Sequence, residues 1–413
     1  MGPILAQGLG VVGRGQVSAA SSVLFIAVTI AAFGVPEAAN FLAARDKRTT
    51  RKLLKHTVWI LTLHGVVATI AIAILAPILS GGSAATESLI YLAAIATVPT
   101  LVTGALRGVA QGLYRWDLVN SERYWTAGLR FVPLAGLLVF GILTPALAVV
   151  VLGFAPAVSG AVYIGLRSDA HKSDSSEGSA IGPREILGYG SSQWIGSMSG
   201  IILSRIDQVL MTPLAGSFQL GIYAVAVNVA EGVLVASTAV RMVVFSAEAS
   251  SPNDERVAKA SRMSLVITAA LGALLIAPIW IWLPVLFGQE FRTSIGPSIV
   301  LIAGTILSVP GFLAGAVIAA RGRPLIRSIS LIVAALVNIA CVLALVPPFG
   351  AMGAAYATLV GSVVGANINI WAMRRMYGVS TLAFYAVSKA DLAYLFTSSR
   401  DLAYRALRRS PDR

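Results

Sequence analysis

The chain has 413 residues, of which 57% are hydrophobic and 12% charged, and its formal net charge is +13. Soluble domains carry about 25% charged residues, so this composition excludes an ordinary soluble protein and indicates a polytopic membrane protein. The positive charge does not indicate nucleic-acid binding, because the basic residues lie in short clusters between apolar runs of about 20 residues, the length that crosses a bilayer. The single cysteine, Cys341, excludes an intramolecular disulfide framework.

Apolar runs bounded by turn and charge signals predict an all-α membrane protein with eleven spans. These lie at about 16–44, 53–79, 87–113, 119–143, 145–166, 186–211, 218–247, 256–284, 294–320, 324–346 and 350–376. Lys and Arg then set the orientation. The connection 45–52 is strongly basic, the connection 77–87 has no Lys or Arg, and this alternation continues along the chain. We call the first side the basic side; by the positive-inside rule it is cytoplasmic and also carries the C-terminus, in a cytoplasmic membrane.

Four segments are expected along the chain: an N-terminal helical bundle over 1–166, a cytoplasmic linker over 167–184, a C-terminal six-helix bundle over 185–376 and a basic tail over 377–413. The linker is rich in Ser, Asp and Lys, which is typical of a flexible connection. The tail is interpreted either as an amphipathic helix on the anionic inner surface of the membrane or as a solvated end.

The opening residues 4–10 read like the last turns of a helix and its exit. We therefore expect twelve spans, with the first one missing from this sequence. Six spans in each half would cross the membrane in the same sense, so the two bundles are expected to be parallel repeats.

Signals for catalysis are absent from the sequence. There is no G-x-x-x-x-G-K-[ST], no H-E-x-x-H and no D-x-D, and the three histidines lack the spacing of metal ligands. We therefore predict that the chain is not an enzyme and has no catalytic residue, metal site or cofactor.

Polar residues inside the spans are the candidates for function, since a charge at bilayer depth usually faces a protein interior or a watery cavity. In the sixth span, polar or small residues recur every three to four positions, on one helix face, at Gln193, Ser197, Gly200, Ser204 and Asp207. This face is either the lining of a cavity or a small-residue helix seam, and the carboxylate of Asp207 favours the cavity. Arg205 lies about 200° round the helix from Asp207, so it either snorkels outward or pairs with a neighbouring helix.

The seventh span carries Asn228 and Glu231 on one face, and Glu231 lies about 20 Å below the outer end. That depth favours a cavity role for Glu231 over a structural contact. Arg130, in the fourth span, is interpreted either as a cavity residue that meets an anionic head group or as a snorkelling anchor. Weaker candidates lie near the basic ends of the third and first spans, where Arg107 is expected to be interfacial and Glu37 and Asn40 to be wetted.

Several motifs in chain order resemble the polysaccharide-export branch, the O-antigen or oligosaccharide flippases, of the multidrug/oligosaccharidyl-lipid/polysaccharide (MOP) exporter superfamily. The central motif is R-I-D-Q at 205–208, followed by L-G-I-Y-A-V-A at 220–226 and A-E at 230–231. Three other stretches agree with the same family: L-F-G-Q-E-F at 286–291, F-G-A-M-G-A-A-Y-A-T at 349–358, and the glycine-rich residues 5–15.

The resemblance implies two six-helix bundles around a central, often cationic cavity. It also implies export of a lipid-linked oligosaccharide to the outer leaflet by alternating access, with coupling to Na⁺ or H⁺ common in the wider superfamily. Arg130 and Arg205 would then contact the diphosphate, while Asp207 and Glu231 would serve coupling or gating. The expected partners are a lipid-linked glycan, membrane lipids and other polysaccharide-assembly proteins. The alternatives are a cation-coupled drug antiporter of the same fold and a membrane glycan polymerase or ligase.

Overall fold

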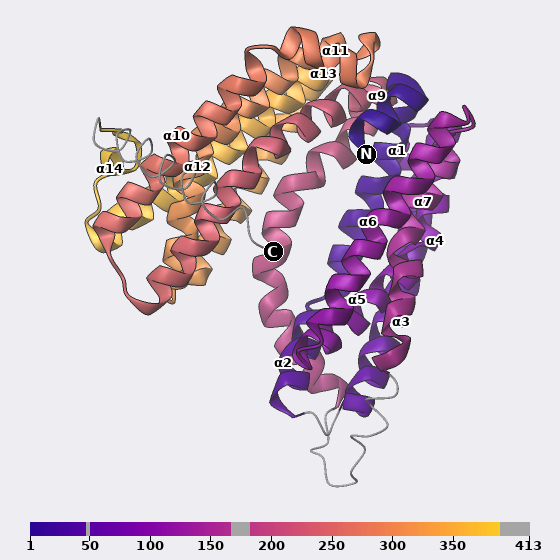
Figure 1. Cartoon of the computed structure of the whole chain (residues 1–413), viewed down its shortest axis with the longest axis horizontal. Coiled ribbons are helices and arrows are strands. Elements are labelled where there is room, and N and C mark those ends of the chain that lie inside the picture. Colours follow the sequence, from indigo (N-terminus) through magenta and orange to yellow (C-terminus); the bar gives the residue numbers. More distant parts are fainter. Residues whose placement is uncertain (47–49, 167–181, 389–413) are drawn as a thin grey trace, which may run out of the picture. The chain divides into compact units, whose positions relative to one another are not determined.

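The computed structural model describes residues 1–46, 50–166 and 182–388. Within these ranges the chain forms helices and no strand, which confirms the all-α prediction. Figure 1 shows the elements in order: α1 (Gly2–Ala32), α2 (Val35–Arg45), α3 (Thr50–Leu79), α4 (Ala84–Ile95), α5 (Thr97–Gly112), α6 (Trp116–Val139), α7 (Pro145–Ser159), η2 (Gly160–Gly165), α9 (Pro183–Ser250), α10 (Asp254–Ile276), α11 (Ile279–Phe287), η3 (Gln289–Ser294), α12 (Ile295–Ala320), α13 (Pro324–Tyr377) and α14 (Thr381–Tyr385).

Eight helical segments of the described residues are long and apolar enough to cross a membrane. Two of them contain a break in the helical backbone, at Gly216 in α9 and at Gly350 in α13, so each is a pair of spans. The helix α6 is not among the eight, although its length is sufficient, because it carries charged residues at Asp117, Glu122, Arg123 and Arg130. Splitting the two broken helices and adding α6 gives the eleven spans predicted from the sequence.

Several expected spans differ in detail from the helices that form. The first span was expected at 16–44, but α1 begins far earlier and ends at a left-handed turn through Phe33 and Gly34, after which α2 is a separate helix. The expected helices at 87–113 and 256–284 are also each divided in two. Proline accounts for two of these breaks, because Pro36 starts a new helix and Pro278 cannot donate the next backbone hydrogen bond.

The described chain clusters into two compact units. The first comprises Met1–Ala226, Trp280–Pro297 and Ile339–Ala354, and the second comprises Val227–Ile279, Ser298–Asn338 and the described residues from Ala355 onward. Residues 167–181 of the expected linker and 389–413 of the expected tail lie outside the described residues. The segment boundaries expected from the sequence therefore remain predictions.

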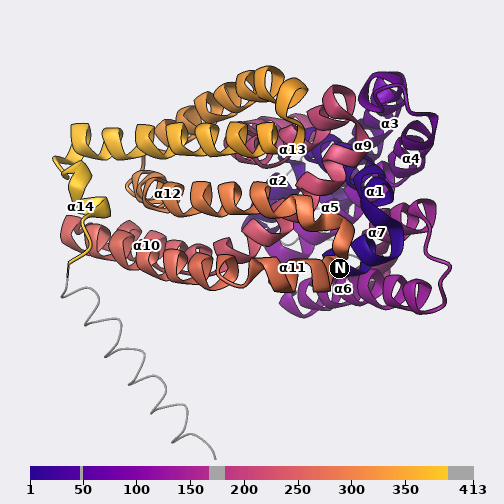
Figure 2. The same cartoon turned by 90° about the horizontal axis from the view of Figure 1, so that it is seen from above.

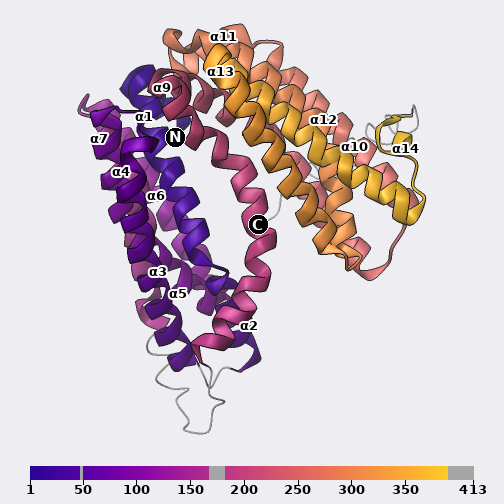
Figure 3. The ribbon, with the colours of Figure 1, turned by 180° about the vertical axis from the view of Figure 1, so that it is seen from behind.

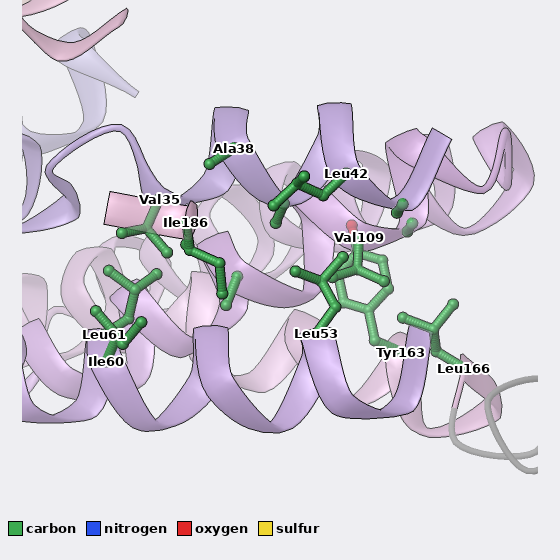
Figure 4. Packing of buried hydrophobic residues seen from close by; sticks show 14 of the residues in the cluster. Val35, Ala38, Leu42, Leu53, Ile60, Leu61, Val109, Tyr163, Leu166 and Ile186 are labelled. Atoms are coloured by element: carbon green, nitrogen blue, oxygen red, sulfur yellow. The ribbon is translucent and has the colours of Figure 1, made fainter. Parts of the chain in front are cut away.

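One buried cluster of the first unit joins α2, α3, α5, η2 and the start of α9 on the basic side (Figure 4). Small residues bring the helix backbones together there, since a Cβ on Gly108 or Gly112 of α5 would overlap backbone oxygens of α2. Lipid tails are as apolar as leucine, so close packing of this kind, rather than transfer out of water, holds membrane helices together.

At the opposite side, α1 and α9 cross with their backbones in contact (Figure 3). Each helix has a break at a glycine with positive φ, Gly10 at 66° and Gly216 at 79°, and each has a second glycine five residues later. A Cβ on Gly15 would overlap the carbonyl of Ser217, and a Cβ on Gly221 would overlap the carbonyl of Val11. The same local arrangement thus occurs twice and makes a reciprocal contact, which brings the polar residues of α1 and α9 together.

The second unit is built on α10, α12 and the two segments of α13, which run side by side (Figure 2). Gly272 lets α10 pack on α12, Gly304 and Gly311 let α12 pack on the second segment of α13, and Gly361 packs that segment against the first one near Asn338. The short helix α14 packs against the first half of α10, where Arg262 and Ser261 donate hydrogen bonds to the carbonyls of Ala383 and Phe384.

Candidate functional site

A first polar cluster of the first unit, which we call the α1–α9 cluster, lies along α1 below its crossing with α9. Arg14 is buried, and its Nη1 donates to the Ser18 hydroxyl at 2.7 Å, one helical turn further along α1. Two turns beyond Arg14, the Ser22 hydroxyl donates to Oε1 of Gln208 at 2.9 Å. The Nε of Arg14 is buried with no hydrogen-bond partner among the described residues. The cluster therefore holds a cation whose hydrogen-bonding capacity is not used up.

Asp207 belongs to the same cluster and is 2% exposed. Its carboxylate accepts a hydrogen bond from the Tyr223 hydroxyl and one from the Gln208 backbone N–H at 2.7 Å. The break at Gly216 turns α9 back on itself, so that Tyr223, on the second segment, faces Asp207 on the first. The buried charge thus has partners on both segments of α9.

Arg205 completes the α1–α9 cluster. Its guanidinium carbon lies 5.7 Å from the centre of the Phe25 ring, a cation–π contact with α1. This contact is with α1 and not with the seventh span, the next helix along the chain. The positive charge of Arg205 is also close enough to interact with that of Arg14. Two arginines from different helices therefore place like charges near one another, an arrangement that an anion stabilises.

A second cluster of the first unit, the α5–α6 cluster, is centred on Glu122. The side chain of Glu122 is 1% exposed, and both of its oxygens accept from Arg107, with Nε at 3.0 Å and Nη2 at 2.9 Å. Thr126, one turn along α6, donates to Oε1 at 3.1 Å, and the Ser159 hydroxyl at the end of α7 lies 2.6 Å from that of Thr126. Such a two-pronged arginine pair is the strong form of a charge-assisted hydrogen bond.

Two more polar groups border the α5–α6 cluster. Arg130 interacts electrostatically with Glu122 and with Arg107, and its Nε is buried without a hydrogen-bond partner in the described part of the chain. The hydroxyl of Tyr163, on η2, is also buried and faces Arg107 and Glu122. Two arginines thus lie near one carboxylate, which leaves the cluster with an excess positive charge.

The remaining candidates from the sequence lie apart from these clusters or outside what is described. Glu231 is exposed and Asn228 is half-buried in the second segment of α9, while Glu37 is exposed and Asn40 half-buried in α2. The side chains of Gln193 and Ser197 lie outside the described residues, and Ser204 is exposed. The structure brings Arg107 close to Arg130, whereas Arg205 contacts Phe25 and Asp207 bonds to Tyr223. The roles of all these residues in binding remain predictions.

Sequence reasoning missed Arg14, Glu122 and Tyr223. For Glu122 and Tyr223 the sequence does hold a signal: each lies as far after a turn between two helices as its partner lies before that turn. The helices α5 and α6 are joined by a turn at Tyr114 and Arg115. Arg107 lies seven residues before Tyr114, and Glu122 lies seven residues after Arg115. Because both helices rise about 1.5 Å per residue, residues equally far from a tight turn lie at the same depth.

The second unit has a charged cluster of a different kind at the basic ends of its helices. Glu248, fully buried at the end of α9, accepts from Arg256 of α10 at 2.6 Å and from Arg321, after α12, at 2.7 Å. Arg321 also pairs with Asp254 at 2.8 Å and lies 4.6 Å from the centre of the Tyr377 ring. Burial alone would raise the pKa of Glu248, but the hydrogen bonds from the two arginines outweigh it and lower the pKa below its usual value. Because its acidic and basic side chains pair with one another, we interpret this cluster as one that stabilises the fold, a structural fastening between α9, α10 and α12.

Comparison with known proteins identifies the family of this chain. The model of the family described as "Polysaccharide biosynthesis protein" matches residues 1–245. The chain belongs to this family. No curated protein resembles the sequence closely enough to count as a relative.

Several solved structures of membrane transporters are similar in fold to this chain. A multidrug resistance MATE family transporter of the MOP superfamily in an inward-facing conformation is similar with a TM-score of 0.69 and 16% identity, over 92% of this chain and 95% of the other. The lipid II flippase MurJ in an inward closed conformation is similar with a TM-score of 0.66 and 13% identity, over 100% and 92%. The MATE multidrug transporter DinF-BH is similar with a TM-score of 0.58 and 14% identity, over 93% and 91%.

At these identities the likeness establishes the fold. Together with the family match, it confirms the resemblance to the polysaccharide-export branch of the MOP superfamily that the motifs indicated, and the chain is a multi-pass membrane protein with the fold of a MOP transporter.

Proposed function

We propose that this chain is a secondary transporter that flips a lipid-linked oligosaccharide, a glycan repeat on a polyprenyl diphosphate, from the inner to the outer leaflet. Transport proceeds by alternating access and serves the export of cell-surface polysaccharide. The protein resides in the cytoplasmic membrane with its basic side and C-terminus in the cytoplasm, where other polysaccharide-assembly proteins deliver the substrate. It acts without catalysis and without a bound cofactor; coupling to Na⁺ or H⁺ supplies energy.

The family match carries this proposal, since it connects the chain with polysaccharide biosynthesis. The buried arginines support it chemically. A diphosphate is recognised best by guanidinium groups, which match its oxygens with paired donors. Arg14 and Arg205 come from two helices, and Arg14 has an unused buried donor. In the proposed mechanism they hold the diphosphate, Arg130 and Arg107 add positive charge, and Asp207 and Glu231 respond to the coupling ion.

Two other functions compete with flipping. The fold is also that of multidrug transporters, so a cation-coupled drug antiporter is the first alternative. Unpartnered arginine donors disfavour it, because a cationic drug requires acidic and aromatic surroundings. A membrane glycan polymerase or ligase is the second alternative, which the absence of catalytic motifs disfavours.

The direct test reconstitutes the protein in liposomes with a fluorescent undecaprenyl-diphosphate oligosaccharide and measures how fast the label becomes accessible to a quencher outside. We expect protein-dependent flipping that Arg14→Gln and Arg205→Gln reduce by an order of magnitude or more, as loss of charged contacts worth about 1.5–3 kcal/mol implies. Arg115→Gln is the matched control, because the Arg115 side chain is 37% exposed and forms an ion pair with its near neighbour Asp117.

The carboxylates are tested in the same assay. Asp207→Asn and Glu231→Gln are expected to impair flipping while leaving membrane insertion intact. Normal flipping by both variants would remove these two residues from the mechanism. Lengthening of glycan chains by the purified wild-type protein would favour the polymerase, and failure to flip the glycolipid combined with drug efflux would favour the antiporter.

A further inference from the structure

Glu122 is a buried carboxylate that the proposed mechanism does not use. It lies in α6, where a permanent negative charge is costly unless it is paired. Arg107 takes both carboxylate oxygens, and Thr126 donates to one of them. In this state the ion pair occupies the guanidinium of Arg107, so Arg107 is not available to a ligand.

The two partners differ in their access to the surroundings. The side chain of Arg107 is 36% exposed, whereas that of Glu122 is 1% exposed. An anion that arrives from outside the cluster therefore meets the arginine and cannot meet the carboxylate. Arg130 already supplies a second positive charge beside the pair, with a buried Nε that lacks a partner among the described residues. The cluster thus presents a net positive charge to an anion through Arg107.

Moving Arg107 onto an anion has a consequence for Glu122. Its carboxylate would stay behind, buried, with hydroxyl groups as its nearest partners and Arg130 as the remaining charge. An uncompensated buried charge is avoided in proteins by a change of protonation. A proton that binds to Glu122 leaves a neutral carboxylic acid, which the hydroxyls of Thr126 and Ser159 can still satisfy because each can donate or accept.

From this arrangement we propose that Glu122 is a proton-binding switch that controls whether Arg107 is available to the anionic group of the substrate. With Glu122 ionised, Arg107 is held in the ion pair. With Glu122 protonated, Arg107 is released and binds a phosphate oxygen, so that anion and proton bind together. The inference rests on the proposed function for the identity of the anion, a polyprenyl diphosphate, and assigns Glu122 as a positioning residue that acts through Arg107.

The titratable and charged groups around Glu122 are few. Arg107 faces it from α5, Tyr163 from η2 and Arg130 from α6 itself. The helix α7 contributes the Ser159 hydroxyl and carries no titratable side chain, and Arg14, the titratable residue within α1, bonds instead to Ser18. No second carboxylate of these elements faces Glu122, so one proton is the expected stoichiometry.

The experiment measures binding of undecaprenyl diphosphate to the purified full-length protein in detergent. Calorimetric titration in two buffers of different ionisation enthalpy, from pH 6 to 9, gives the number of protons taken up on binding. We expect the wild-type protein to take up about one proton more than Glu122→Gln at neutral pH. The subtraction removes protons that the diphosphate itself exchanges. Affinity in Glu122→Gln should lose its added pH dependence and be no weaker than in the wild type, whereas a merely structural Glu122 predicts weaker binding.

Three further variants complete the test. Thr126→Val removes a donor to the carboxylate, so the pH dependence of proton uptake should shift from that of the wild type even if Glu122→Gln fails to fold. Arg107→Gln should bind the diphosphate at least tenfold more weakly. Glu87→Gln, which changes a carboxylate that bonds to Tyr91 in an exposed pair, is the matched control and should behave as the wild type does.

The outcomes separate the two proposals. Equal proton uptake by the wild type and Glu122→Gln, or no shift in Thr126→Val, overturns the switch and leaves the flippase proposal standing. Failure of the wild-type protein to bind undecaprenyl diphosphate at any pH overturns both.

Discussion

Three buried carboxylates of the described chain, Asp207, Glu122 and Glu248, are each paired across a nearby turn. Asp207 and Tyr223 are each eight residues from Ala215, and Glu248 and Arg256 are each four residues from Pro252. A buried charge destabilises a helical span unless a partner neutralises or hydrogen-bonds it. Residues equally spaced about a turn reach the same depth whenever the hairpin forms. Local chain geometry therefore supplies one partner for each carboxylate, and Glu248 gains a second one, Arg321, from beyond α12.

The Glu248 cluster makes the second unit sensitive to acid. Its hydrogen bonds lower the pKa of Glu248 in the folded protein, so they stabilise the fold above the ordinary glutamate pKa. That contribution is lost as the pH falls through the lowered value, because the protonated carboxyl no longer holds Arg256 and Arg321. We expect the melting temperature in detergent to fall between pH 6 and pH 3, and Glu248→Gln to remove part of this fall.

Glu248→Gln should also reduce stability at neutral pH by about 3–5 kcal/mol, the usual effect of removing one partner from a buried ion pair. Glu255→Gln is the control, since Glu255 is exposed in the first turn of α10. Equal melting temperatures for Glu248→Gln and the control at neutral pH would show that the cluster is not a fastening.

The sequence identified members of the α1–α9 and α5–α6 clusters but not how they are paired. Charge in an apolar span drew attention to Arg130, Arg205 and Asp207, because residue type and depth, which a sequence does show, set the cost of an unpaired buried charge. Arg14 lies only four residues beyond the break at Gly10. From the sequence it therefore looks like a residue at the end of a span and not like one buried inside it. The unused donors of Arg14 and Arg130 depend on the distances between individual atoms, which no pattern of hydropathy contains.

At the level of elements, hydropathy predicts how many helices cross the membrane and fails to predict where they bend. The apolar run from 87 to 113 is continuous, yet α4 and α5 are separate helices. A window of hydropathy averages over the one or two residues that change direction. The breaks at Gly10 and Gly216 are visible in the structure because both residues take a positive φ that other residues rarely adopt.

The crossing of α1 with α9 is expected to tolerate no side chain at Gly221. An added Cβ would overlap the carbonyl of Val11, so Gly221→Ala must separate the two helices. Overpacking of this kind costs about 1–3 kcal/mol, and we expect a lower melting temperature in detergent. Gly128→Ala is the matched control, since a Cβ there meets nothing within 4 Å, and alanine in a helix is favoured over glycine by about 1 kcal/mol. If Gly221→Ala is as stable as Gly128→Ala, the backbone contact is not close in the protein.

At the level of the whole molecule, topology follows from the distribution of positive charge and not from any single site. Insertion places Lys- and Arg-rich connections inside because their transfer across the bilayer is costly. The connection of α9 to α10, through Ser251, is then expected in the cytoplasm, and the start of α4, at Ala84, outside. Under the proposed function, this orientation decides which leaflet is the inner one from which the lipid-linked anion is taken.

The single cysteine makes the orientation directly measurable. In a Cys341→Ala background, Ser251→Cys and Ala84→Cys each place one thiol at an exposed position. A membrane-impermeant maleimide should label Ala84→Cys in intact cells and label Ser251→Cys only after lysis. The opposite pattern would invert the chain and would reverse the proposed direction of transport. Labelling of Ser251→Cys in both conditions, with Ala84→Cys labelled only after lysis, constitutes that pattern, and the unsubstituted Cys341→Ala protein provides the background signal.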